Sequence, residues 1–195
     1  MSEIQVNKIS PSSGTTITLG DSGDTFTIPS GATITNSGTA TGFGGDNTPA
    51  FKAYRSGTFS IPDSSATKIP FNDDSSAGFY DTDSKYDATT NYRFTPTVAG
   101  KYFVYGYAYL DSQASSNFDQ GRLYIFKNGS AVNQSANNMG GNFPEAMTIN
   151  VNNILDLNGT TDYVELYAWV NDTSGTPIIR GQRFAEFGAY KIIGA

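Results

Sequence analysis

The sequence contains neither cysteine nor histidine. Without cysteine there are no disulfide bonds and no thiolate chemistry, and without histidine the commonest general base and the commonest metal ligand are both missing. A pair of carboxylates can hydrolyse a glycosidic bond without histidine, yet nothing in the sequence marks out one pair. We therefore expect a protein that is not an enzyme, and we keep a glycan hydrolase only as a distant alternative.

Long basic runs and long apolar runs are missing too. The 12 Lys and Arg residues are outnumbered by 18 Asp and Glu, which gives a formal net charge of −6. No basic run could follow a phosphate backbone, so nucleic-acid binding is not expected. No apolar run is long enough to span a bilayer, so membrane insertion is not expected either. The first residues are polar and lack the apolar centre of a signal peptide, which predicts synthesis in a cytoplasm without export through a cleaved signal.

What the sequence does contain is glycine and aromatic residues. Of its 195 residues 21 are Gly, and 13% are aromatic, a mix that favours many short strands joined by tight turns. No segment has the pattern of an amphipathic helix of three turns or more, so the predicted fold class is all-β. Asn128-Gly129 is a strong hairpin signal, because both turn positions can need positive φ. Strands are expected at residues 51–55, 57–61, 67–69, 92–95, 101–110, 122–127, 131–134, 148–157, 163–170 and 183–193.

The first 46 residues differ from the rest and repeat a short pattern. Three segments match Gly-x-Thr-apolar-Thr, and their apolar members are Ile17, Phe26 and Ile34. One such strand buries almost nothing alone, whereas repeats become stable by stacking on copies of themselves or on other chains. We predict a slender β shaft of three intertwined chains with these side chains as its core. The alternative is a disordered linker, which the Thr, Gly and Ser content allows. A turn-rich hinge over 42–49 separates segment 1–46 from a head over 47–195.

The strand expected at 101–110 is apolar or aromatic on both faces, as if it were covered on both sides. A second strand, at 163–170, has a core face of Val164, Leu166, Ala168 and Val170 and an aromatic opposite face. Aromatic faces of this kind suit a subunit interface. An alternative is that the odd-numbered face of the first strand fills the core while Tyr102, Val104 and Ala108 point to a partner. The residues favoured for a threefold interface are Phe103, Tyr105, Tyr107, Tyr109, Tyr167 and Trp169.

Three loops combine Asn, Ser and Gly with a few aromatic or basic residues, which suits adaptable recognition. Ordinary loop composition explains any single one of these residues as well. The candidates for receptor contact are Phe118, Asn137, Asn138, Phe143 and Arg180. No cofactor is expected. Clustered carboxylates can supply oxygen ligands to calcium, but we favour a solvated acidic loop for the cluster formed by Asp73, Asp74, Asp81 and Asp83.

The segment from Phe51 to Ile193 resembles the C1q/tumour-necrosis-factor-like jelly roll. The likeness is spread over the segment and includes Tyr-Arg-Phe-Thr-Pro-Thr-Val-Ala-Gly-Lys-Tyr at 92–102 and Phe-Gly-Ala-Tyr at 187–190. Ala189 stands where that family usually has Gly. The resemblance implies an all-β sandwich head of ten strands that forms a compact homotrimer. It does not imply a ligand, since this fold carries many binding functions.

Residues 1–29 resemble the start of fibre and appendage proteins of tailed bacteriophages. That resemblance implies a virion protein whose N-terminal part joins other virion proteins and whose head is displayed. The predicted function is therefore a trimeric tail fibre or spike whose head binds a host-surface glycan or protein. The alternative is a capsid-decorating head fibre or adaptor protein with a purely structural role.

Overall fold

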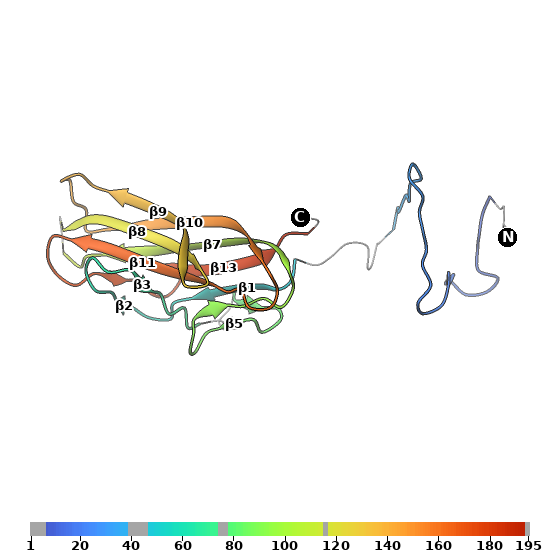
Figure 1. Ribbon diagram of the computed structural model, residues 1–195, viewed down its shortest axis with the longest axis horizontal. Coiled ribbons are helices and arrows are strands. Elements are labelled where there is room, and N and C mark those ends of the chain that lie inside the picture. Colours follow the sequence, from blue (N-terminus) through green and yellow to red (C-terminus); the bar gives the residue numbers. More distant parts are fainter. Residues whose placement is uncertain (1–6, 39–46, 74–77, 115–116, 194–195) are drawn as a thin grey trace. The chain divides into compact units, whose positions relative to one another are not determined.

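The computed structural model describes residues 7–38, 47–73, 78–114 and 117–193 (Figure 1). The chain divides into two compact units, Met1–Phe43 and Gly44–Ala195. The boundary predicted at residue 46 falls just beyond this division, among residues outside the described ranges. We refer to the second unit as the head.

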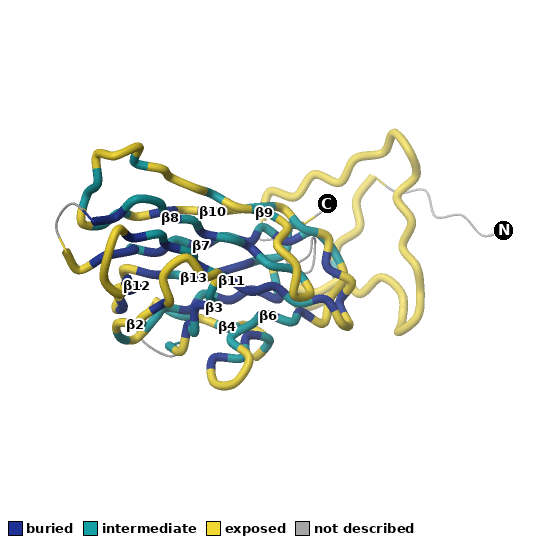
Figure 2. Tube along the Cα trace, turned by 60° about the vertical axis from the view of Figure 1, so that its left-hand side comes forward, coloured by how far each residue is buried: buried dark blue, intermediate teal, exposed yellow. Residues whose placement is uncertain are grey.

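In the N-terminal unit, residues 7–38 form turns but no strand. Two of these turns are closed by backbone hydrogen bonds, from the N–H of Asp24 to the carbonyl of Asp21 and from the N–H of Ala32 to that of Pro29. Figure 2 shows this segment exposed along nearly all of its described length. The predicted shaft strands are therefore not formed in the single chain, and their ordering by association stays a prediction.

The head is a sandwich of two antiparallel sheets (Figure 1). The seven-stranded sheet has the order β2-β12-β7-β13-β1-β4. Strands β12 and β13 pair with successive parts of β7, and β10 pairs with β7 along its whole length. The six-stranded sheet has the order β5-β6-β11-β8-β9, with β3 also paired to β11. The strands are β1 (Ala50–Tyr54), β2 (Phe59–Ser60), β3 (Thr67–Lys68), β4 (Tyr80–Asp81), β5 (Tyr86–Asp87), β6 (Arg93–Phe94), β7 (Gly100–Asp111), β8 (Phe118–Lys127), β9 (Ser130–Asn138), β10 (Ala146–Leu157), β11 (Val164–Asp172), β12 (Ile178–Ile179) and β13 (Ala185–Lys191).

The core lies between the two sheets, where alternate residues of each strand point inward. Tyr102, Val104 and Ala108 of β7 are fully buried there, so the alternative in which they face a partner is wrong. The core face predicted for β11 is confirmed, since its four residues are fully buried. One end of the core is an aromatic cluster in which the ring of Phe51 stacks 4.5 Å from that of Tyr86.

The strand predictions were correct for the long strands and incomplete for the short ones. Strands β4, β5 and β12, each two residues long, were not predicted, whereas the equally short β2, β3 and β6 lie within longer predicted strands. Strand β8 begins at Phe118 and β9 continues to Asn138, so both extend into segments that composition had suggested were loops.

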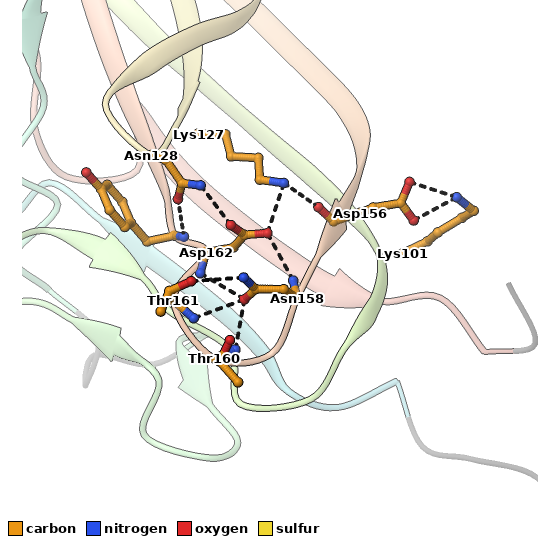
Figure 3. A network of polar contacts seen from close by, with 9 residues as sticks. Lys101, Lys127, Asn128, Asp156, Asn158, Thr160, Thr161 and Asp162 are labelled. Carbon is orange, nitrogen blue, oxygen red and sulfur yellow. Dashed lines mark hydrogen bonds and ion pairs between the residues drawn. The ribbon is translucent and has the colours of Figure 1, made fainter.

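A buried carboxylate fastens the β8–β9 turn to the loop after β10 (Figure 3). Asp162 is 8% exposed and accepts hydrogen bonds from Asn128 Nδ2 (2.7 Å) and the Asn158 N–H (3.0 Å). Lys127 Nζ lies 2.9 Å from it. Donation by Asn128, the largest contribution, and by Lys127 lowers the pKa of Asp162. Within this loop, a Cβ on Gly159 would lie 2.4 Å from the Ala99 backbone nitrogen, which explains why glycine is needed at that position.

Candidate interaction surfaces

The outer surface of the seven-stranded sheet carries a row of aromatic rings. Strand β7 alternates fully buried residues with half-buried Phe103, Tyr105, Tyr107 and Tyr109, whose side chains therefore share the outer face. From β13, Tyr190 pairs with Phe103, and their ring centroids lie 5.5 Å apart. We call these five residues the aromatic face. The sequence-predicted β7 residues thus lie together on the outside of the sandwich.

Two tyrosines of the aromatic face are partly withdrawn from water. A Cβ on Gly188 would lie 2.4 Å from the Tyr105 ring, so this ring lies directly over the glycine. Burial, with the nearby charge of Glu186, raises the pKa of Tyr105 and Tyr107. The hydroxyl of Tyr107 donates to the carbonyl of Arg183 at 2.8 Å. Both rings are therefore held in place within one chain, and their neutral form is favoured.

Tyr167 and Trp169 do not belong to this surface. They lie on β11 of the six-stranded sheet, opposite its fully buried core residues, and therefore face outward on the other side of the sandwich. The Tyr167 ring stacks 4.0 Å from that of Phe126, and the Arg122 guanidinium lies 4.7 Å above the Trp169 ring. The six residues predicted for the threefold interface therefore lie on two opposite surfaces of the sandwich, because alternation along one strand does not say which sheet the strand joins. Their part in an interface stays a prediction.

Four of the five residues favoured for receptor contact lie outside the core at one end of the head; the fifth, Phe118, is buried there. We call this end the tip: there β7, β9 and β11 finish and β8 and β10 begin, as the pairs Asp111–Ala146 and Gln120–Asn138 show. Asn137 and Asn138 are exposed at the end of β9. Phe143 lies half-buried in the loop that follows, which is tied to β8 by a bond from the Phe118 N–H to the Pro144 carbonyl.

Phe118 itself is a correction, because its side chain is fully buried in the core. Its polar neighbours suggested a loop, but β8 begins at this residue and its ring seals the tip end of the core. Arg180 is exposed at the tip and bonds through Nε to Asp111 Oδ2 at 2.6 Å. Its guanidinium also lies 5.6 Å from the Tyr109 ring, so the tip adjoins the aromatic face.

No protein-family model matches the chain, and no curated protein matches it. Solved structures do match. The Eiger TNF of S. frugiperda shares 15% identity and a TM-score of 0.51, over 75% of this chain and 93% of that one. The globular domain of the zebrafish complement 1qA protein shares 16% identity and a TM-score of 0.51, over 74% and 97%. The chain contains a C1q/TNF-like jelly roll. This confirms the fold expected for the head.

Of the acidic loop in the jelly-roll head, the structure describes Asp73, Asp81 and Asp83, and these three carboxylates are not gathered around one point. Asp81 accepts hydrogen bonds from the N–H groups of Lys85 and Tyr86, both at 2.9 Å, and Asp74 lies outside the described residues. Among the described parts of the chain, no three acidic side chains are placed to hold a metal ion, and no helix is long and apolar enough to cross a membrane.

Sequence reasoning missed two features of the jelly-roll head. Tyr190 was not assigned to the aromatic face, because its neighbour Phe103 is identified only by the pairing of β13 with β7. Asp172 was also overlooked, although alternation along β11 continues from Val170 and would have placed this carboxylate on the core side.

Proposed function

We propose that this protein is a trimeric tail fibre or spike of a bacteriophage, whose jelly-roll head binds a glycan or protein on the host surface. The observation that supports this best is that one chain carries two apolar surfaces that it does not cover itself. One is the aromatic face of the head, and the other is the set of apolar side chains in residues 7–38.

The N-terminal apolar residues need partners from outside the chain. Phe26 is 68% exposed, Ile34 51% and Ile17 41%, and Leu19, Phe26, Ile28 and Ile34 line one hollow. Leaving such side chains in water forgoes about 1.5–3 kcal/mol for each. Three parallel copies would bury them against each other, as expected for stacked repeats, and would yield the predicted shaft with Ile17, Phe26 and Ile34 in its core.

The aromatic face supplies the matching surface in the head. Large rings with one polar end are typical of subunit interfaces, and the C1q/TNF-like resemblance implies a homotrimer. Tyr167 and Trp169 lie on the opposite side of the sandwich, so they would contact a different part of a neighbouring copy or remain exposed.

The position of the tip favours display of its loops. The chain enters the head at Ala50, which pairs with Tyr190 of β13, and Tyr190 pairs in turn with Phe103 near the start of β7. The tip lies at the other end of β7. Asn137, Asn138, Phe143 and Arg180 are thus at the end farthest from the N-terminal segment's entry point, where a host receptor would be met first. The N-terminal segment would then join other virion proteins.

Two experiments test this proposal: immunogold labelling of virus particles with antibodies against the head, and binding of the purified full-length protein to cells and to a glycan array. We expect gold particles on the tail and binding of the protein to cells. Gold on the capsid without cell binding would instead establish the decorating or adaptor role, and shortening of array glycans would establish a hydrolase. A double substitution Asn137→Ala and Asn138→Ala should abolish binding, whereas Gln134→Ala, exposed earlier on the same strand, should preserve it.

A further inference from the structure

A carboxylate without a hydrogen-bond donor lies inside the tip end of the head. Asp172, the last residue of β11, is 7% exposed. Neither of its carboxylate oxygens accepts a hydrogen bond from any residue that the structure describes. Asp172 continues the buried positions of Ala168 and Val170 along the strand, so its side chain points toward the interior. Buried carboxylates are normally hydrogen-bonded, paired with a cation or coordinated to a metal.

A second carboxylate lies beside it. Asp63, in the loop between β2 and β3, accepts the Asp172 N–H at Oδ1 (2.8 Å) and the Ser64 hydroxyl at Oδ2 (3.2 Å). That loop is held against β11 by a bond of 2.7 Å from the Ser64 N–H to the Val170 carbonyl. Each carboxylate oxygen has a further lone pair beyond the bond it accepts. Because Asp63 Oδ1 lies 2.8 Å from the main-chain nitrogen of Asp172, the exposed carboxylate of Asp63 and the buried carboxylate of Asp172 belong to neighbouring positions in the fold.

No described basic side chain forms an ion pair with either carboxylate. Arg180, an exposed cation at this end, is already bonded to Asp111 at 2.6 Å. Asp172 is thus a buried carboxylate that neither a hydrogen-bond donor nor a cation of the described residues neutralises.

We propose that Asp172 and Asp63 bind a hard divalent cation, calcium, at the tip end of the head. Calcium accepts six to eight oxygen ligands in flexible geometry, whereas magnesium requires a near-ideal octahedron. The two carboxylates supply the charge, and main-chain carbonyls and water complete the shell. These ligands are separate from the acidic loop that contains Asp81. A cation here would link the β2–β3 loop to the end of β11 and so stiffen the tip.

The full-length protein, freed of metal with EDTA and dialysed at pH 7.5, is titrated with CaCl2 and separately with MgCl2, while its melting temperature is followed. Calcium should raise the melting temperature to saturation, with at least a tenfold lower midpoint than magnesium. Calorimetric titration with CaCl2 should give one site per chain. The proposal would be overturned if calcium changed neither the melting temperature nor the calorimetric signal.

Two isosteric variants identify the ligands. Asp172→Asn should melt higher than the wild type in EDTA, because it removes an unpaired buried charge, and should lose the calcium response. Asp63→Asn should raise the calcium midpoint at least tenfold. Asp156→Asn, at an exposed carboxylate far from the tip, should respond as the wild type does. An unchanged calcium response in Asp172→Asn would place the ion elsewhere and refute the assignment. If that variant does not fold, the wild-type calorimetry and Asp63→Asn decide.

Discussion

Replacing Asp162 by Ala should destabilise the head more than any surface carboxylate substitution. The variant removes three interactions at once, those with Asn128 Nδ2, the Asn158 N–H and Lys127 Nζ. A hydrogen bond to a charged group contributes about 1.5–3 kcal/mol. The donors lie near the surface and regain some water, so the three together should be worth about 3 kcal/mol. For a chain of this size that corresponds to a fall in melting temperature of about 6–12 °C.

Asp156→Ala is the matched control, because Asp156 belongs to the same network (Figure 3). Its ion pair with Lys101 is 2.8 Å long, but the two side chains are 77% and 45% exposed. Exposed pairs contribute about 0–1 kcal/mol. Both variants are melted by circular dichroism at one protein concentration, since association makes melting concentration-dependent. An equal fall in melting temperature in the two variants would refute the idea that burial makes the contribution of Asp162 to stability larger than that of Asp156.

The pH dependence provides a second check on the same carboxylate. Because the folded protein lowers the pKa of Asp162, its ionised form stabilises the fold at neutral pH. That contribution is lost as pH falls below about 4, through the lowered folded pKa. The difference in unfolding free energy between the wild type and Asp162→Ala should therefore shrink in that acid range. A difference that stays constant down to about pH 2 would contradict the assigned cause.

Three further predictions concern assembly and packing. Tyr105→Glu should convert a particle of three times the 20.8 kDa chain mass into monomers in light scattering, because burial of an unpaired charge costs several kcal/mol. Val132→Glu, at an exposed position on the edge strand β9 of the other sheet, should keep the trimer mass, and a trimeric Tyr105→Glu would show that the aromatic face is not the interface. Gly159→Ala should cost about 3 kcal/mol in urea unfolding, because its Cβ meets the Ala99 backbone at positive φ; an unchanged midpoint would disprove this contact. Phe26→Asp should make residues 7–38 of the full-length protein sensitive to protease while the head stays intact, and equal protection of both proteins would argue against the shaft.

Much of the head could be predicted from the sequence because its long strands have one buried apolar face. In β11, Val164 and Val170 mark that face and set the register of every residue between them. Local pattern has no such information on which sheet a strand joins, and this is why Trp169 was grouped with the β7 aromatics. The two-residue strands exist only through their neighbours: Ile178 is a strand residue because it pairs with Asp111 and Ser60.

The candidate sites were less predictable, since they depend on contacts between distant segments. Phe118 has polar residues before it and was therefore interpreted as a loop anchor. The pairing of β8 with β11 instead places its ring in the core. The Asp63–Asp172 pair joins residues 109 positions apart, and only the fold brings them together. The repeats around Phe26 pose the opposite case, because the pattern is clear in the sequence but the partners that we propose for it lie on other chains.

The start of β1 and the end of β13 are paired strands at the end of the head opposite the tip. The chain thus enters β1 and leaves β13 at the base of the sandwich. Mutations, insertions and deletions in the loops at the far end can accumulate without disturbing how the head is attached or how its sheets pair. For the receptor-binding function that we propose, such a layout would let specificity diversify on an unchanging scaffold, and it makes those loops the natural place to graft a ligand preference.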